Sequence, residues 1–165
     1  MDNELIKNNS ELNSIFDNIK DLIINSRNNI YNTVNIEMLH LYWNIGRIIM
    51  EIQQGNERAG CGDAVVDKLS QRLTNEFGRG FSKRNLERMR KFYTIFNNEK
   101  ISATVSHKFS WSHFVEFIKI DNNVKREFYL TMCANEGWSI RTLKERINSM
   151  LYERTAISKK PEETI

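Results

Sequence analysis

The near absence of proline constrains the fold of this 165-residue chain more than any other feature. The single proline is Pro161, close to the C-terminus. Proline ends helices because it lacks an amide hydrogen and its ring clashes with the preceding turn. Nothing before Pro161 therefore prevents long helices, and the Gly and Pro clusters that punctuate β-rich chains are nearly missing. The sequence predicts an all-α fold of about six or seven helices.

Length and composition indicate one domain with a core, or two small helical lobes that pack together. Hydrophobic residues make up 40% and charged residues 27% of the chain, which is enough apolar surface for folding. The start, Asp2 to Glu4, is acidic, unlike a signal peptide, and no apolar run approaches the ~18 residues of a membrane-spanning helix. Cys61 and Cys133 lack metal-ligand or disulfide spacing. We expect a cytoplasmic protein with no membrane contact, no metal and no cofactor.

Apolar residues recur at three- and four-residue steps through the first third of the chain. From Glu11 to Val34 they predict one long helix or two in line, and Asn35 can cap a further helix over 36–54. The LYWNIGRII sequence of that helix is apolar around most of its circumference, which predicts the centre of the core. Gly46 costs a helix about 1 kcal/mol relative to Ala, so we expect another backbone to approach it closely.

Charge and periodicity divide the chain into three segments. Segment 1–57 holds eight acidic and four basic residues, so it is a poor surface for nucleic acid. We predict that its helices form a packing or pairing lobe. Segment 58–154 is predicted to be a helical domain that contains a helix-turn-helix, and 155–165 loses its periodicity and is predicted to be a tail or linker.

The stretch EFGRGFSKRNLERMRKFYTIF, over 76–96, has the pattern of helix, short glycine turn and helix. Its glycines tolerate a positive φ, and the Ser82 hydroxyl can cap the second helix. Four apolar side chains then fall on one face of that helix: Leu86, Met89, Tyr93 and Phe96. We interpret the stretch as a helix-turn-helix whose recognition helix runs from Lys83 onward.

The outward face of this predicted helix is basic. Residues 79–91 include six Lys or Arg and one acid, Glu87, in a chain whose net charge is only +3. Such a local patch is expected for phosphate contact, because each cation placed on a phosphate releases condensed counterions. A basic face that is simply solvated remains the alternative. The predicted DNA-binding residues are Arg79, Lys83, Arg84, Asn85, Arg88, Lys91 and Arg141, with Asn85 near enough to a groove edge to bond a base.

Arg141 comes from a second stretch with the same pattern. The residues WSIRTL over 138–143 repeat FSKRNL over 81–86 as aromatic, Ser, any residue, Arg, any residue, Leu. The chain therefore contains two candidate helix-turn-helix units. The second is the weaker candidate for nucleic acid, because Glu145 on its outward face offsets Arg141.

A short helix is predicted to begin at the SWSH sequence of 110–113. Ser110 with His113 suggests a nucleophile, but no Gly-x-Ser-x-Gly elbow and no acid placed to orient the His accompany them. We therefore interpret them as a helix cap. Asp121 is predicted to cap the next helix, and Gly137 to end it.

Four blocks of this sequence, in this order, resemble the N-terminal domain of the YhcG-like family: LYWNIGRII, LSQRLTNEFGRGFSKRNLERMRKFY, SWSHFVEF and EFYLTMCANEGWSIRTLKERINSMLYERT. The resemblance runs from about Asn35 to Lys160. It implies a helical DNA-binding module, which in most members precedes a PD-(D/E)xK nuclease domain. Such a nuclease needs an acid-x-Lys pair beside a metal-binding Asp, and this sequence has no Glu-x-Lys or Asp-x-Lys. We expect a stand-alone or truncated module without catalytic activity.

Two function classes follow. The preferred one is a non-catalytic module that binds double-stranded DNA and guides a nuclease on a separate subunit. The alternative is a protein-interaction or oligomerisation module, in which the acidic N-terminal helices pair with themselves or with a nuclease or defence-system component. Size-exclusion chromatography with and without duplex DNA separates the two classes.

Overall fold

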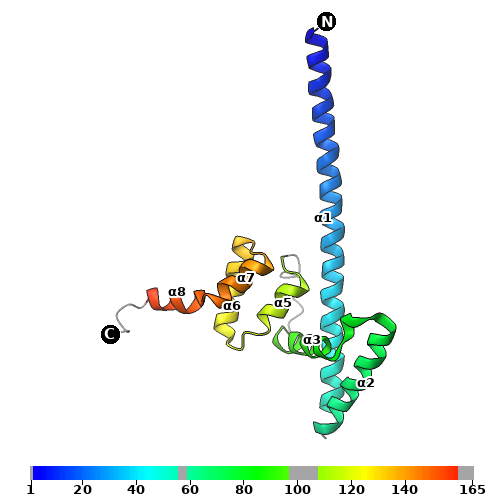
Figure 1. Ribbon diagram of the computed structural model, residues 1–165, viewed down its shortest axis with the longest axis vertical. Helices are drawn as coiled ribbons and strands as arrows, with labels where there is room; N and C mark the ends of the chain where they lie inside the picture. The colour runs from blue at the N-terminus through cyan, green and yellow to red at the C-terminus, as the bar shows by residue number, and fades with distance from the viewer. Residues whose placement is uncertain (1, 56–58, 97–107, 160–165) are drawn as a thin grey trace.

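The computed structural model describes residues 2–55, 59–96 and 108–159. These residues form seven α-helices and one 3-10 turn and contain no strand, which confirms the all-α prediction. In chain order the elements are α1 (Asp2–Gly55), α2 (Ala59–Phe77), η1 (Arg79–Phe81), α3 (Lys83–Ile95), α5 (Trp111–Phe117), α6 (Asn123–Glu136), α7 (Ile140–Asn148) and α8 (Leu151–Lys159), as labelled in Figure 1.

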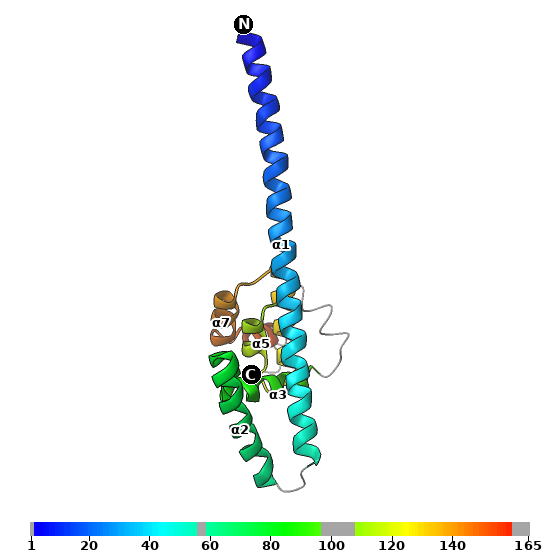
Figure 2. The ribbon, with the colours of Figure 1, turned by 90° about the vertical axis from the view of Figure 1, so that its right-hand side faces the viewer.

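Helix α1 is a single helix of 54 residues. Its N-terminal part extends away from every other labelled element, whereas its C-terminal part crosses α3 and lies beside α2 (Figures 1 and 2). We call residues 2–34 the arm; each of its side chains from Leu12 to Val34 is exposed. The predicted helix start at Asn35 is wrong. The Asn35 side chain instead donates a hydrogen bond to the Phe109 carbonyl at 2.9 Å, so it joins α1 to the chain before α5.

The crossing of α1 and α3 is centred on Gly46. A Cβ at this position would lie 2.1 Å from the carbonyl oxygen of Met89 and 2.7 Å from its carbon. This contact confirms the predicted approach of another backbone. Around it lies the smaller of two buried apolar clusters, formed by Tyr42, Ile49, Val66, Leu86 and Met89.

The larger cluster is rich in aromatic residues and joins α1 and α3 to the remaining helices. The Phe92 ring lies 4.8 Å from Phe114 and 5.5 Å from Trp111, between ring centroids. Trp43 donates its indole N–H to the Phe96 carbonyl at 2.7 Å, which satisfies a buried donor. The apolar periodicity of the sequence predicts eight core residues, and all of them lie in, or pack against, one of the two clusters: Trp43, Ile45, Ile49, Leu73, Leu86, Phe92, Phe114 and Leu143.

Several predicted helix ends are shifted. Asp63 has the residue type of a helix cap and predicts a helix from Ala64, but α2 begins earlier, at Ala59. Helix α6 is capped by the Asn122 side chain, which accepts from the Lys125 amide at 2.9 Å, and not by Asp121. Gly137 ends α6 with a φ of 61°, as predicted.

The C-terminal helix α8 covers part of the predicted tail. The chain is helical as far as Lys159, and the rest of the tail lies outside the described residues. The Tyr152 side chain is half-buried, with its ring 5.4 Å from Phe128. A 2.5 Å ion pair between Lys125 and Glu153 also joins α6 to α8, and it raises the pKa of Lys125 and lowers the pKa of Glu153.

Ser110 and His113 close the N-terminus of α5, which agrees with the capping interpretation. His113 Nδ1 lies 3.2 Å from the Ser110 amide nitrogen and 2.9 Å from Ser110 Oγ, and Nε2 lies 3.1 Å from the Trp138 carbonyl oxygen. Because the amide can only donate, Nδ1 is the acceptor and Nε2 carries the proton. The neutral ring thus ties α5 to the turn before α7, and its burial lowers the pKa of His113.

Gly46→Ala is expected to destabilise the protein by about 1–3 kcal/mol, the usual cost of overpacking. The Met89 carbonyl that the new methyl group meets belongs to a helix backbone and cannot rotate away as a side chain would. This cost exceeds the ~1 kcal/mol that alanine gains in helix propensity. Urea unfolding measures the difference. Gly80→Ala is the control, since no atom lies within 4 Å of its added Cβ; equal or greater stability of Gly46→Ala would contradict the close crossing.

The free energy of unfolding is expected to fall as the pH drops below the ordinary histidine value of 6.5. Because the pKa of His113 is lowered in the folded state, the unfolded chain binds the proton first. The stabilisation is complete above 6.5 and is lost as the pH falls through the folded-state pKa. Urea unfolding at about pH 7.5 and about pH 5 measures the change. His113→Gln should reduce this pH dependence, whereas His40→Gln, at an exposed position of α1, should retain it. An unchanged dependence in His113→Gln would exclude His113 as the source.

Candidate nucleic-acid interface

The connection between α2 and α3 is a tight turn with a defined bracing contact. Gly78, with a φ of 89°, ends α2 and leads into η1. Ser82 occupies the position before α3, but its side chain makes no capping hydrogen bond, so the predicted hydroxyl cap is wrong. The Asn85 side chain instead donates to the Gly80 carbonyl at 2.6 Å. The first turn of α3 is therefore tied back to η1 by an amide.

Packing fixes which face of α3 is exposed. Leu86, Met89 and Phe92 are almost completely buried against α1 and the aromatic cluster. Side chains on the opposite face of a helix must then point into solvent. That side of α3 carries Arg84, which is exposed, and Arg88, which is half-buried, about one turn apart.

The predicted phosphate-binding cations differ in whether they have partners within the protein. Lys83 Nζ lies 2.6 Å from Asp67 on α2. Lys91 Nζ lies 3.1 Å from Asp121. Both pairs are exposed, so each contributes little to stability and can open. Among these predicted cations, three guanidinium groups have no hydrogen bond or ion pair with any residue of the described ranges: Arg79, Arg84 and Arg88.

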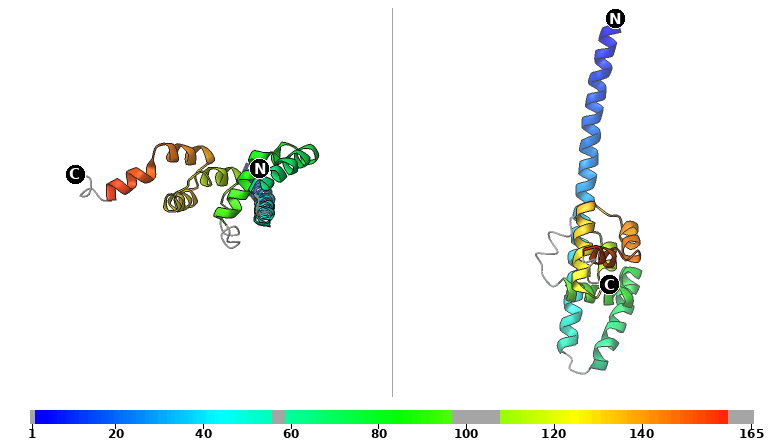
Figure 3. Two further views of the ribbon diagram at one scale, coloured as in Figure 1. Left: turned by 90° about the horizontal axis from the view of Figure 1, so that it is seen from below. Right: turned by 90° about the vertical axis from the view of Figure 1, so that its left-hand side faces the viewer.

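Arg141 does not belong to this surface. It lies on α7, and Figures 1 and 3 show α5 between α3 and α7. Its guanidinium is 3.0 Å from Glu145, four residues later on the same helix, as the sequence indicated. The structure thus gathers six of the seven predicted residues around η1 and α3 and places the seventh elsewhere.

The turn between α6 and α7 shares two features with the turn between α2 and α3. Gly137, like Gly78, has a positive φ. Leu143 and Leu86 are both completely buried. The backbone of the two turns differs, because Gly78 has a ψ of −176° and leads into η1, whereas Gly137 has a ψ of 41° and no 3-10 turn follows it. Unlike Ser82, Ser139 does cap its helix, because its side chain accepts from the Thr142 amide at 3.2 Å.

Phe77 is an exposed aromatic residue at the end of α2. The apolar spacing of Val66, Leu69, Leu73 and Phe77 predicts that its ring is buried, but its side chain is 60% exposed. Its ring lies 5.9 Å from the ring of Phe81, edge to face, so the two aromatic side chains flank the basic turn at Arg79. The signal was present in the sequence, since Phe77 immediately precedes Gly78, where α2 ends.

The described residues give little support for a metal site, a reactive thiol or a membrane-spanning helix. Within residues 2–55, 59–96 and 108–159, no three His, Cys, Asp or Glu side chains come together as metal ligands would. Burial raises the pKa of Cys133 to about 11, which keeps this thiol protonated; Cys61 lies outside the described side chains. A search of the described helices found none that combines the length and apolarity needed to cross a bilayer.

Comparisons with known proteins agree with the resemblance noted from the sequence blocks. The protein named "Putative nuclease YhcG" from Escherichia coli (strain K12) is 32% identical over 174 residues. The match covers 87% of this chain and 46% of that protein, so the chain spans about half the length of this curated relative. No solved structure matches the chain. Residues 18–154 match the family described as the DUF1016 N-terminal domain, and the chain therefore belongs to this family.

Proposed function

We propose that the chain is a non-catalytic module that binds double-stranded DNA through η1 and the exposed face of α3. The observation that carries this proposal is the set of three guanidinium groups without partners among the described residues, at Arg79, Arg84 and Arg88. A guanidinium fork matches the geometry of a phosphate and makes two parallel hydrogen bonds to it. Lys83 and Lys91, in contrast, each pair with an acid.

The two lysines extend the same surface. Their ion pairs are exposed, and exchange of a surface carboxylate for a phosphate costs little. In this proposal α2, η1 and α3 act as a helix-turn-helix with α3 against the duplex. Asn85 would have to leave the Gly80 carbonyl to reach a base, so the proposal rests on phosphate contacts and on no particular base sequence.

The relative from Escherichia coli supports nucleic acid as the ligand, because it is named a putative nuclease. A module with this surface would hold duplex DNA for a nuclease that acts on it. The nuclease is then either a partner subunit or another part of a longer protein.

A specific observation favours a second candidate function, protein–protein interaction through the arm. The arm exposes large apolar side chains along its whole described length; Leu22 is 70% exposed and Ile30 is 63% exposed. Contiguous exposed apolar surface of this kind marks interaction sites in folded proteins. The two functions use different surfaces and are compatible.

Duplex affinity is expected to fall steeply with salt, with a slope of log affinity against log salt of about −2.7 for three phosphate contacts. Arg84→Ala with Arg88→Ala should flatten this slope by about 2 units, since each lost contact removes about 0.9. Fluorescence anisotropy with a labelled duplex, over a series of salt concentrations, measures both slopes. Neither arginine packs into a buried cluster, so the variant should keep its thermal transition.

The matched control is Arg141→Ala with Lys144→Ala, which removes the same charge from α7, away from the proposed surface. It should lower affinity less and leave the slope nearly intact. If the Arg84 and Arg88 variant is folded and binds DNA with unchanged affinity and unchanged slope, the proposed surface is wrong. Equal effects of the two double variants would indicate only a response to net charge.

The purified chain is expected not to cleave DNA or RNA. Its sequence contains no acid-x-Lys pair, which a metal-dependent nuclease of the PD-(D/E)xK type uses to hold the metal and orient water. Incubation of labelled DNA and RNA with the chain and Mg²⁺ or Mn²⁺ tests this expectation. Cleavage that is abolished by chelation and stays with the protein through successive columns would overturn it.

A further inference from the structure

Helix α1 carries an apolar stripe that no described part of the chain covers. We define the stripe by six residues whose side chains are between 45% and 63% exposed: Leu12, Ile19, Ile23, Ile30, Val34 and Leu41. Such side chains lose favourable burial free energy while they face water, about 25 cal/mol for each Å² of apolar surface. A helix that is apolar on one face is normally packed along that face.

The stripe has a regular spacing. Leu12, Ile23 and Val34 follow one another at steps of eleven residues, and so do Ile19, Ile30 and Leu41. Eleven residues make three turns of a nearly straight helix, so these side chains stay in line instead of winding around α1. From Leu12 to Leu41 the line is about 44 Å long, at 1.5 Å per residue.

We propose that the stripe pairs with the same stripe of a second copy of this chain, so that the protein is a homodimer held together by α1. The inference rests on the second candidate function, the arm as an interaction element, and it names the partner. A partner helix must carry apolar residues with the same eleven-residue spacing to remain in contact over such a length. An identical copy meets this requirement by symmetry, as in most soluble oligomers.

We call the helices that follow α1, over residues 59–96 and 108–159, the helical lobe. The stripe remains accessible where α1 meets this lobe. In that region Leu39 and Trp43 face the lobe and are buried, whereas Leu41 stays 45% exposed on another side of the helix. Just beside Val34, a hollow lined by Met38 and Trp111 opens between α1 and the start of α5. A second helix that follows the stripe can therefore continue past the base of the arm and gain apolar contact there.

The surface area and the charge of the arm both suit a second copy. A fully buried Leu or Ile side chain removes roughly 60–120 Å² from water, so the six half-exposed side chains of the stripe offer on the order of 300 Å² per copy. Two copies would bury roughly 600 Å² of apolar surface and, since interfaces are about 60% apolar, about 1,000 Å² in total, the lower limit for a specific interface. Between Leu12 and Val34 the charged residues are two acids and two bases: Asp17, Lys20, Asp21 and Arg27. Two identical arms therefore do not repel each other.

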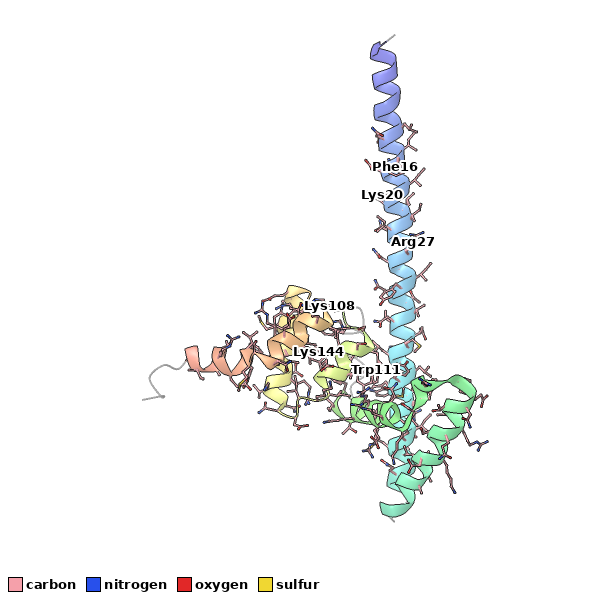
Figure 4. The ribbon with its side chains drawn as sticks, in the orientation of Figure 1. Phe16, Lys20, Arg27, Lys108, Trp111 and Lys144 are labelled. Carbon is pink, nitrogen blue, oxygen red and sulfur yellow. The ribbon has the colours of Figure 1, made fainter. Side chains whose placement is uncertain are left out.

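A lipid surface fits the arm less well. Amphipathic helices that bind anionic membranes carry many Lys and Arg on the polar face. Between Leu12 and Val34 the arm has only Lys20 and Arg27 as basic residues, and its uncharged polar positions are mostly asparagine. Figure 4 shows Phe16, Lys20 and Arg27 on the free part of α1, well away from Lys108 and Lys144 on the lobe.

Sedimentation equilibrium of the full chain over a wide concentration range tests the proposal. The wild-type protein is expected to reach twice the chain mass of 19.5 kDa. Ile23→Asp with Ile30→Asp places two charges in the stripe and should halve the mass. The matched control is Asn25→Asp with Asn32→Asp, which adds the same charges about 200° around the helix, at about 100° per residue. It should stay dimeric.

Three results would overturn the proposal. One is a wild-type chain that stays at 19.5 kDa throughout the range while circular dichroism shows intact helices. Another is an Ile23 and Ile30 variant that remains dimeric, because the interface would then lie elsewhere. The third is a monomeric chain that floats with vesicles of phosphatidylcholine and phosphatidylglycerol, which would assign the stripe to lipid.

The experiment also separates this inference from the DNA proposal. The Arg84 and Arg88 variant should remain dimeric while it loses DNA affinity. The Ile23 and Ile30 variant should become monomeric and still bind DNA with an unchanged contribution of each arginine to the salt slope. If one proposal fails, the measurements still decide whether the other is correct.

Discussion

The close crossing of α1 and α3 is the contact on which the rest of the structure depends. With hydrogen as its only side chain, Gly46 lets the Met89 carbonyl come within 2.1 Å of where a Cβ would lie. This approach allows Leu86 and Met89 to be completely buried between the two helices. It also fixes the rotation of α3 about its own axis. Once that rotation is fixed, the residues that face solvent are determined by helical periodicity.

The helices that follow the two glycine turns differ in whether their first arginine side chain is paired with an acid. Leu86 after the first turn and Leu143 after the second are equally buried, so the packing role of the repeated sequence is the same. Arg141 on the second helix is paired with Glu145. Arg84, at the corresponding position of the first, has no partner among the described residues. A buried leucine in the helix after a glycine turn thus occurs once with a compensated surface and once with an uncompensated basic surface.

Much of the fold follows from local patterns in the sequence, because those patterns act over one or two helical turns. The absence of internal proline and the three- and four-residue apolar steps are sufficient for the helices. The cost of a glycine within a helix predicted that another backbone approaches Gly46 closely, as the Met89 backbone does. Gly137 was predicted to end its helix, and it does so in the left-handed backbone conformation. The predicted core was also confirmed, because an apolar face identifies buried candidates wherever a partner is available.

Tertiary structure decided which of these patterns have partners. Asn35 looked like a helix cap, but its partner is the carbonyl of Phe109, 74 residues away in the sequence. Lys83 and Arg84 are adjacent cations, yet only the first meets an acid, Asp67 on the neighbouring helix. The periodicity of the arm resembles that of a core helix, although its apolar face has no cover in the described chain. The sequence determines which face of a helix is apolar or charged, but whether another group lies against that face depends on contacts between distant residues, and only the folded chain establishes those.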